Sequence, residues 1–539
     1  MSEPVAKQAY DYVIVGGGTA GCVLANRLSA SGGYTVLLIE AGPADRYPWI
    51  HIPIGYAKTM FNPRYNWGFH TEAESELNNR KLYWPRGKVL GGSSSINGLI
   101  YIRGQAQDYD AWEAAGNPGW GWKDVLPTFR KLERNERGAS EYHGDSGPLG
   151  CSDIHDRPEL MEAIIRAGND IGVPATDDFN GASQEGIGYY QLLTRNGWRS
   201  STAVGYLKPA RGRANLQVVT ESFAQRILFR GRQAVGVRYE RGGTMFDVEA
   251  TREVVLCAGA IQTPQLLELS GIGNPAILKA NGIDVVHELA GVGENLQDHL
   301  QFRLMFRCKK PITTNDELGS WRRRMGIGLR YIFTRSGPMA VGINHVGMFA
   351  RALPESETPD VQFHIAAVTA ERAADKPHSW PGFTFSVCQL RPKSRGSIHV
   401  RSANISDAPS IRANYLTQED DWRCSIAGVR LAQRLAASPS MADYTHSTYR
   451  PASPARSDED VKEFCREHGA TIFHPVGTCR MGADTHAVVD ARLRIRGLSN
   501  IRIADASIMP LLVSGNTSAP ATMIGEKASE MILEEANAQ

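Results

Sequence analysis

The chain has 539 residues, which is too long for one ordinary hydrophobic core, so we expect two or more lobes. Its 59 Lys and Arg residues nearly balance its 57 Asp and Glu residues, and the net charge of +2 argues against nucleic-acid binding through bulk charge. With 42% hydrophobic and 22% charged residues, the composition is typical of a globular protein.

The sequence shows neither targeting nor metal-binding patterns. Residues 1–10 lack a basic segment followed by an apolar one, and no later run of about 20 apolar residues could span a bilayer, so a cytoplasmic protein is expected. The eight cysteines form no C-x-x-C pair and no Cys/His spacing suited to zinc. We therefore expect reduced, structural thiols and no metal site.

The first predicted element is a buried parallel strand at Tyr12–Val15. Gly16, Gly18 and Gly21 follow it with the G-x-G-x-x-G spacing, and apolar residues then recur at helical intervals. A second apolar run ends in Glu40, 19 positions after Gly21, where a ribose-binding carboxylate is expected. The helix N-terminus would present backbone N–H groups to a pyrophosphate, so this segment predicts a dinucleotide site, for either NAD or FAD.

Two loop segments and a helix are predicted next. Residues 46–83 are rich in proline and aromatic side chains, which favours a lid or binding loop. Residues 91–95 are two glycines followed by three serines, so the backbone is able to approach a ligand closely and the hydroxyls offer hydrogen-bond donors. Residues 110–135 have a helical pattern, and residues 140–210 a mixed one.

The middle of the chain returns to strands. The segments Asn215–Phe229 and Ala234–Tyr239 alternate like antiparallel strands joined by a turn at Arg230. Glu253–Ala258 is another apolar strand, and the glycine turn at Gly259 with its short helix repeats the N-terminal pattern. We expect this strand to join the first one in a single parallel sheet.

Residues from about 300 to 460 carry no further glycine fingerprint, which suits a second, substrate-binding lobe. Within it, apolar residues at positions 321, 325, 329, 332 and 333 line one face of a predicted helix, and arginines cover the remainder. Such a basic amphipathic helix over residues 321–335 either docks on its own protein or lies on an anionic membrane surface.

The C-terminal segment carries polar residues that could take part in catalysis. His474 precedes Pro475, which biases the histidine backbone toward an extended conformation. Histidine has a pKa suited to taking a hydroxyl proton when an alcohol is oxidised. Asn516 stands just before a final helix that is predicted to end near residue 535, so it could hydrogen-bond a substrate oxygen, cap the helix, or do both.

Together these segments resemble the glucose-methanol-choline (GMC) oxidoreductase family over nearly the whole chain. Two family signatures match at residues 87–104 and 259–273, alongside the N-terminal fingerprint and the His474 and Asn516 segments. The chain looks most similar to bacterial FAD-linked dehydrogenases of aliphatic primary alcohols, whose relatives are often labelled choline dehydrogenase-like. The resemblance implies FAD as the cofactor, a choice that the fingerprint alone leaves open.

The resemblance also implies an α/β fold, α+β overall. A Rossmann-type FAD-binding lobe would be interleaved in sequence with a substrate-binding lobe built on an antiparallel sheet with helices. The implied FAD-binding domain comprises residues 8–45, 84–110, 213–300 and 465–537, and residues 46–83 form the lid. The implied substrate-binding domain comprises residues 111–212 and 301–464.

The cofactor-binding residues implied by the resemblance are spread along these segments. They are Gly16, Gly18, Thr19, Ala20, Gly21, Glu40, Ala41, Trp67, Arg86, Val89, Gly91, Gly92, Asn97, Gly98, Leu99, Ile100, Ala224, Ala258, Gly259, Asp505, Ala506, Asn516 and Thr517. Relatives with covalently attached flavin carry a histidine at the position of Ile96, so noncovalent FAD is expected here.

The resemblance assigns catalysis to His474 and Asn516. His474 would accept the hydroxyl proton, Asn516 would orient the oxygen, and a hydride would pass to flavin N5, so that an aldehyde leaves. The electrons would then reach a quinone or another non-NAD acceptor. The expected location is cytoplasmic, with peripheral contact to the inner membrane through residues 321–335 as an open alternative.

Other activities on the same scaffold remain open. An FAD alcohol oxidase would pass the electrons to O₂ and produce H₂O₂, and a hydroxynitrile lyase would cleave a cyanohydrin without reducing the flavin. Choline is not the expected substrate, because His345 stands where choline-specific relatives tend to carry a glutamate that holds the trimethylammonium group.

Overall fold

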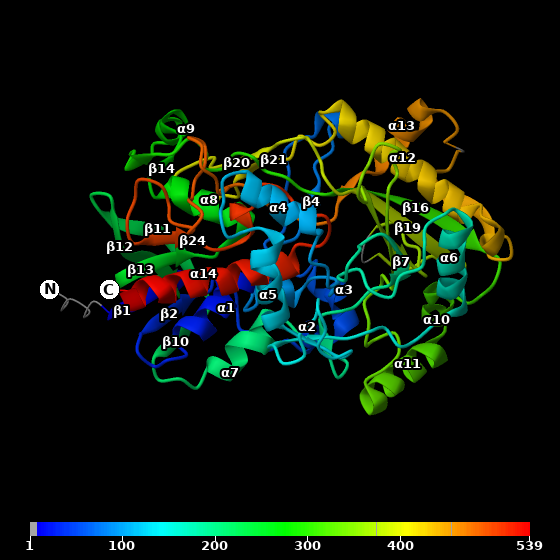
Figure 1. Ribbon diagram of the computed structural model, residues 1–539, viewed down its shortest axis with the longest axis horizontal. Coiled ribbons are helices and arrows are strands. Elements are labelled where there is room, and N and C mark those ends of the chain that lie inside the picture. Colours follow the sequence, from blue (N-terminus) through cyan, green and yellow to red (C-terminus); the bar gives the residue numbers. More distant parts are fainter. Residues whose placement is uncertain (1–7, 373–374, 454, 539) are drawn as a thin grey trace.

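The computed structural model describes residues 8–372, 375–453 and 455–538, which are organised around two seven-stranded sheets. One sheet lies toward each end of the long axis (Figure 1), and each is accompanied by its own large hydrophobic cluster. This is the two-lobed α/β architecture that the sequence predicts. Residues 1–7, where no leader pattern is expected, lie outside the described residues. Among the described helices, none combines the length and hydropathy of a membrane span.

The first sheet is built on parallel strands of apolar residues. Its order is β10 (Leu216–Val219), β2 (Val36–Ile39), β1 (Gln8–Val15), β13 (Thr244–Leu256), β12 (Gln233–Arg241) and β11 (Ser222–Arg230), with β24 (Ile501–Ile503) also paired to β13. β1 runs parallel to β2 and β13, as predicted. Residues 12–15 and 36–39 are buried, as expected for parallel strands covered on both faces.

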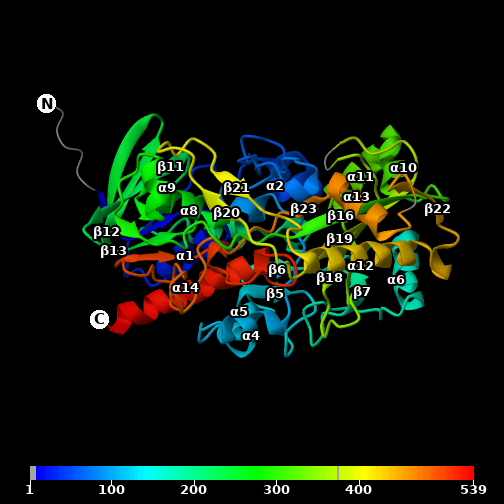
Figure 2. The ribbon, with the colours of Figure 1, turned by 90° about the horizontal axis from the view of Figure 1, so that it is seen from above.

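Helices follow directly from the two glycine turns. α1 (Thr19–Leu28) begins after β1, and α8 (Gly259–Leu269) begins after β13. α14 (Ser518–Ala538) lies along α1 at this end of the molecule (Figure 1 and Figure 2). Gly525 permits the close approach, because a Cβ atom there would lie 3.0 Å from the Ala20 Cα. The final helix thus exists as predicted and ends at Ala538.

Two segments differ from the predicted elements. Residues 215–229 are not one strand of a hairpin, because β10 pairs parallel with β2 and only β11 pairs antiparallel with β12. Side chains alternate between the two faces of a strand whether its partner strand is parallel or antiparallel, so the sequence pattern does not distinguish the two pairings. The predicted helix over residues 110–135 is two helices, α4 (Ala106–Ala114) and α5 (Trp122–Leu132). They are separated because Gly116 adopts a φ of 90° and Pro118 follows it.

The second sheet is antiparallel, as the family resemblance implies. Its order is β22 (Thr445–Arg450), β16 (Leu300–Cys308), β19 (Gly382–Gln389), β18 (Val361–Ala366), β17 (Val346–Ala350) and β7 (Gly186–Tyr189), with β23 (Ala470–Thr471) also paired to β16. α12 (Glu419–Ala436) packs against it (Figure 2), where a Cβ on Gly428 would lie 2.9 Å from Val387. α6 (Glu159–Asp170) and α13 (Asp458–His468) complete this end of the molecule.

Residues 46–83 form short elements instead of one irregular loop. They include α2 (Pro48–His51), α3 (Tyr56–Thr59) and β3 (Phe69–His70), which pairs with β4 (Tyr83–Trp84). Aromatic stacking holds the segment together: the rings of Tyr47 and Tyr65 are 5.1 Å apart, and those of Phe61 and Tyr83 are 5.2 Å apart. A lid function for this segment stays a prediction.

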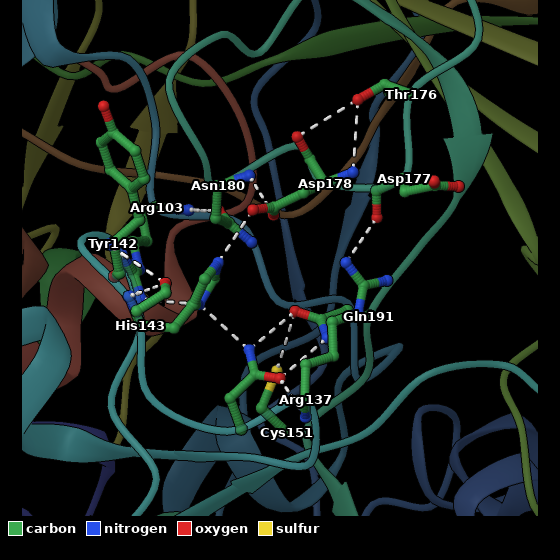
Figure 3. Close-up of polar contacts among 12 residues, drawn as sticks. Arg103, Arg137, Tyr142, His143, Cys151, Thr176, Asp177, Asp178, Asn180 and Gln191 are labelled. Atoms are coloured by element: carbon green, nitrogen blue, oxygen red, sulfur yellow. Dashed lines mark hydrogen bonds and ion pairs between the residues drawn. The ribbon is translucent and has the colours of Figure 1, made fainter.

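A buried polar cluster joins segments that are distant in the chain (Figure 3). The Arg103 guanidinium lies 2.7 Å from the Glu133 carboxylate, and both side chains are fully buried. His143 lies between two carboxylates, with Nδ1 2.7 Å from Glu133 and Nε2 2.9 Å from Asp178. Burial disfavours the charged imidazole, but the hydrogen bonds to Asp178 and Glu133 outweigh it and raise the pKa of His143 to about 8.

His143 therefore makes stability depend on pH. Because its folded pKa is the higher one, its contribution is complete below the unfolded pKa of 6.5 and is lost as the pH rises through about 8. The gap corresponds to about 2 kcal/mol of unfolding free energy. We expect His143→Gln to lower the thermal midpoint most at about pH 6 and least at about pH 9, as measured by intrinsic fluorescence. A difference that does not change with pH would contradict this charge assignment.

Candidate active site

A cavity of about 1190 Å³ reaches from the first sheet to the second. The turns that follow β1 and β13 form one wall, at the carboxyl ends of parallel strands, where α/β folds bind ligands. Side chains of β16, β18 and β19 form the opposite wall, among them Arg303, His364 and Thr384. The cavity thus joins the predicted cofactor segments to the predicted substrate lobe.

Most of the predicted cofactor-binding residues line this cavity. They are Gly16, Gly18, Thr19, Ala20, Glu40, Ala41, Trp67, Arg86, Gly92, Asn97, Gly98, Leu99, Ile100, Ala224, Ala258, Gly259, Asp505, Ala506, Asn516 and Thr517. The sequence places these residues in seven separate segments, so their convergence is a property of the fold.

Three further predicted cofactor residues lie behind the cavity wall, and their contact with FAD stays a prediction. Gly21 faces β1, where a Cβ would lie 1.9 Å from the Gly16 oxygen. Gly91 donates its N–H to the Gly17 oxygen at 2.7 Å, which fastens the serine-rich loop to the fingerprint turn. Val89 is fully buried in a small apolar cluster with Ile96. These residues shape the wall and do not line it.

The serine-rich loop approaches the fingerprint turn through its backbone. Gly92 adopts a φ of 53°, and a Cβ there would lie 2.7 Å from the Gly18 Cα, so a side chain would not fit. The hydroxyls of Ser94 and Ser95 donate to carbonyls of their own loop at 2.6 and 2.7 Å. The loop backbone therefore lies against the fingerprint turn, whereas these two hydroxyls serve the loop itself. Close approach of this backbone to a ligand stays a prediction.

Glu40 ends β2 and lines the cavity with a buried carboxyl group. Its two oxygens accept the N–H groups of Gly17 and Gly42 at 2.8 and 2.7 Å. Burial raises the pKa of Glu40 to about 7 despite these two hydrogen bonds. The carboxyl group is thus fixed beside the glycine turn, where it is able to accept a hydrogen bond from a ribose hydroxyl.

His474 is buried on the cavity wall and contacts two polar side chains. Its Nδ1 lies 2.9 Å from Nδ1 of His299, and its Nε2 lies 3.2 Å from Nδ2 of Asn516. Residues 297–299 run antiparallel beside 472–476, with backbone bonds between Gln297 and Val476 and from Ile472 to His299. This pairing, continued by β16 and β23, brings together histidines that are 175 residues apart.

The hydrogen-bond chain fixes the tautomer of His474. His299 Nε2 faces the Leu390 carbonyl at 2.9 Å and must donate to it, so Nδ1 of neutral His299 is an acceptor. His474 Nδ1 must then carry a proton, which leaves the lone pair on Nε2, on the side of Asn516. The imidazole is therefore oriented as a proton acceptor toward Asn516.

Burial keeps these imidazoles neutral. It holds the pKa of His474 well below the usual 6.5, and the neighbouring His299, His364 and Arg86 lower it further. Burial also lowers the pKa of His299 to about 4 and that of His364 to about 3. At neutral pH, His474 is thus a free base.

The backbone around His474 is held by several contacts. Asp298 accepts the His474 N–H at 2.6 Å and the Thr471 hydroxyl at 2.6 Å. Phe473 adopts a φ of 73°, which is uncommon for a residue other than glycine, and its carbonyl receives a hydrogen bond from Arg86 at 2.5 Å. Strain of this kind persists where surrounding contacts determine the geometry, as they do at functional sites.

Comparison with known proteins gives the family of this fold and site. Residues 10–301 match the N-terminal part of the GMC oxidoreductase family, and residues 392–525 match its C-terminal part. The chain belongs to the GMC oxidoreductases. It is 46% identical to alcohol dehydrogenase [acceptor] of Pseudomonas putida, over 97% of this chain and 96% of that one. It is also 41% identical to the oxygen-dependent choline dehydrogenase of Brucella anthropi, over 97% of this chain and 95% of that one.

Solved structures of GMC oxidoreductases share the whole architecture. Pyridoxine 4-oxidase from Mesorbium loti superposes with a TM-score of 0.88 at 30% identity, covering 97% of this chain and 99% of that one. A formate oxidase variant from Aspergillus oryzae gives 0.92 at 27% identity, covering 99% and 100%. FAD is the cofactor of the family, and this chain is an FAD-dependent oxidoreductase. No group of described residues is arranged to hold a metal ion.

The residues present fit FAD. Gly16 and Gly92 leave no room for a side chain, because a Cβ there would lie 2.4 and 2.7 Å from neighbouring backbone atoms. Gly18 lines the cavity beside them, so the turn presents backbone, as a pyrophosphate cradle requires. Glu40 stands where a ribose would lie, and the backbone of Ala224 lines the same wall. Asp505 accepts the N–H of Gly259 at 2.9 Å, which joins the C-terminal segment to the start of α8. Ile96 cannot form the histidine link of covalent relatives, and noncovalent FAD stays a prediction.

Asn516 contacts His474 and does not serve as the helix cap. α14 begins at Ser518, and the Asn516 amide lies between two side chains instead. Its Oδ1 accepts Gln362 Nε2 at 3.1 Å, which leaves Nδ2 to donate to His474 Nε2 at 3.2 Å. Gln362 therefore fixes the amide with its donor end toward the histidine.

Three polar residues of this site were not predicted. Gln362 and His364 alternate along β18 and so share one face of that strand, and His299 directly precedes β16. A polar residue on every second position of an otherwise apolar strand is the only local signal that could have marked the first two. His299 has no such signal, because its role depends on the pairing between β16 and β23.

Proposed function

We propose that this GMC oxidoreductase oxidises apolar primary alcohols to aldehydes and passes the electrons to a quinone or another acceptor other than NAD. The observation that carries the proposal is the acceptor orientation of His474 Nε2 beside Asn516, at the inner part of a largely apolar cavity. The 46% identity to an alcohol dehydrogenase [acceptor] supports the same class of reaction.

Two side chains of this protein act on the substrate hydroxyl group. His474 Nε2 accepts the hydroxyl proton, while its Nδ1–H bond to His299 is retained. Asn516 Nδ2, held by Gln362, donates to the substrate oxygen as that oxygen gains negative charge. Bound FAD supplies the acceptor for the hydride that leaves the carbinol carbon. The alcohol thus loses one proton and one hydride and becomes an aldehyde.

The substrate preference follows from the side chains around the rest of the cavity. Apolar residues from several segments line it, among them Tyr56, Met60, Ile312, Met339 and Val341. These surfaces favour an aliphatic or aromatic chain by removing apolar area from water.

Choline is the second candidate, because relatives at 41% identity are named choline dehydrogenases. His345 lines the cavity, and an imidazole, unlike a carboxylate, offers no negative charge to a trimethylammonium group. We therefore rank choline below the apolar alcohols.

The experiment is a substrate and acceptor matrix with the FAD-loaded protein. Decan-1-ol, benzyl alcohol and choline are each supplied with a quinone analogue or with O₂ alone, and aldehyde and H₂O₂ are measured. We expect the apolar alcohols to have the highest kcat/KM and the quinone to be reduced faster than O₂. Stoichiometric H₂O₂ at full rate would establish an oxidase instead. A preference for choline would overturn the substrate assignment, and cyanohydrin cleavage without aldehyde formation from any alcohol would indicate a lyase.

A further inference from the structure

α11 (Trp321–Thr334) stands out from the body of the protein beside α10 (Thr314–Gly319), at the lower right of Figure 1. Of its 14 residues only Tyr331 is buried. Tyr331 donates its hydroxyl to the Gly197 carbonyl at 2.9 Å, and Arg330 pairs with Asp156 at 2.7 Å. The helix is thus attached along one side and leaves its opposite side to the surroundings.

The free side of α11 is apolar. Trp321, Met325, Leu329, Ile332 and Phe333 are 60%, 55%, 50%, 58% and 80% exposed. Their spacing of four, four, three and one residues places them on one face of the helix. With Leu318 on α10, they are six of the twelve large hydrophobic side chains exposed in the described ranges. Single exposed hydrophobic residues are ordinary, but a contiguous set marks an interaction surface.

Arginines border this apolar face. Arg322, Arg323 and Arg324 are exposed in the first turn of α11, and no carboxylate of the described chain lies within ion-pairing distance of them. Positive charge at a helix N-terminus opposes the helix dipole, so these residues do not stabilise the helix itself. The acidic side chains nearby do not neutralise these arginines. Asp156 pairs with Arg330, and Glu317 is half-buried with a raised pKa.

The same helix lines the cavity that holds His474. Ile327, Arg324 and Arg330 of α11 contribute to the cavity lining, together with Glu317 and Leu318 of α10. The outer part of the cavity therefore lies beside the exposed apolar face. A surface that covered this face would lie on a helix that also lines an apolar compartment.

We propose that α11 docks this protein on an anionic lipid bilayer. The apolar face would enter the boundary between headgroups and acyl chains, and Arg322 and Arg323 would contact lipid phosphates. A second copy of the chain is a poorer occupant, because two such faces would bring like-charged arginines together. Docking does not depend on the alcohol chemistry proposed above, although it would place the cavity where apolar alcohols and lipid-soluble quinones are concentrated.

Vesicle co-sedimentation of the FAD-loaded protein tests this proposal. Vesicles of phosphatidylcholine alone are compared with vesicles that contain phosphatidylglycerol, at low and high salt. We expect wild-type protein to partition onto the anionic vesicles and to leave them at high salt. Arg322→Glu/Arg323→Glu should lower the partition coefficient more than about tenfold, since each basic residue near an anionic surface contributes roughly a fivefold factor. Trp321→Ser/Phe333→Ser should lower it comparably.

Matched controls separate docking from general charge and folding. Arg230→Glu/Arg232→Glu makes the same charge change at the exposed β11–β12 turn, and Met245→Ser/Val286→Ser removes exposed apolar side chains elsewhere. Both should partition like wild type, and all variants should keep their FAD and their circular dichroism. Equal partitioning of the α11 variants and wild type would overturn the proposal. So would a light-scattering mass that shows a dimer lost on Trp321→Ser/Phe333→Ser, without vesicle binding by wild type.

Discussion

Replacing His474 with alanine is expected to leave FAD bound and to slow flavin reduction by alcohol about 10²- to 10⁴-fold. The imidazole lone pair on Nε2 is the one acceptor that the hydrogen-bond chain directs toward Asn516, and alanine removes it. The measurement is the rate of anaerobic flavin reduction in wild type and His474→Ala, at equal FAD occupancy.

The pH dependence of the same reaction gives an independent check. Because the pKa of His474 lies well below 6.5, its base form persists as the pH falls. The reduction rate of wild type should therefore not decline between about pH 8 and pH 6. Asn516→Ala serves as the control, since it removes a donor but leaves the base in place. An unchanged reduction rate in His474→Ala would contradict the assignment of the base.

Replacing His299 with leucine is expected to lower kcat about 10- to 100-fold and to change KM little. Leucine removes the acceptor that keeps the proton on His474 Nδ1, so His474 can place the proton on Nε2, where it no longer accepts one. Holding the wrong tautomer is costly in other enzymes that use a histidine base. Steady-state kinetics with a saturating acceptor measures both parameters.

His299→Asn is the matched variant. Its Oδ1 occupies the place of the imidazole Nδ1 and is able to accept from His474, although the bond to the Leu390 carbonyl is lost. We expect it to recover most of the activity that leucine removes. If both variants retained full kcat, His299 would not be a positioning residue. If both lost FAD, its role would be structural.

The local chemistry of the sequence was enough to predict the dinucleotide-binding half of the fold. The apolar run at Tyr12–Val15, the glycine spacing and Glu40 each have a direct physical meaning, and the structure places them together. The alternation of apolar and polar side chains in residues 215–229 was less informative, because a period of two predicts a strand but not which strand it pairs with. The break between α4 and α5 was missed, although Gly116 and Pro118 stand within it.

The active site was predicted only in part. His474 and Asn516 came from the resemblance to GMC oxidoreductases, and the structure places them 3.2 Å apart. Their supporting residues were not predicted, because His299 and Gln362 reach the site through strand pairing across long separations in sequence. Gly21, Val89 and Gly91 lie next to the residues that line the cavity, but the direction of each relative to the wall needed the fold.

The central claim is that an alcohol bound beside His474 reduces the flavin of this protein. Anaerobic mixing of the FAD-loaded protein with decan-1-ol, followed by the visible absorbance of oxidised flavin, tests it most directly. The account predicts loss of that absorbance in a single turnover, with one aldehyde formed per flavin. Retention of the oxidised spectrum with every primary alcohol, in protein that demonstrably contains FAD, would contradict it.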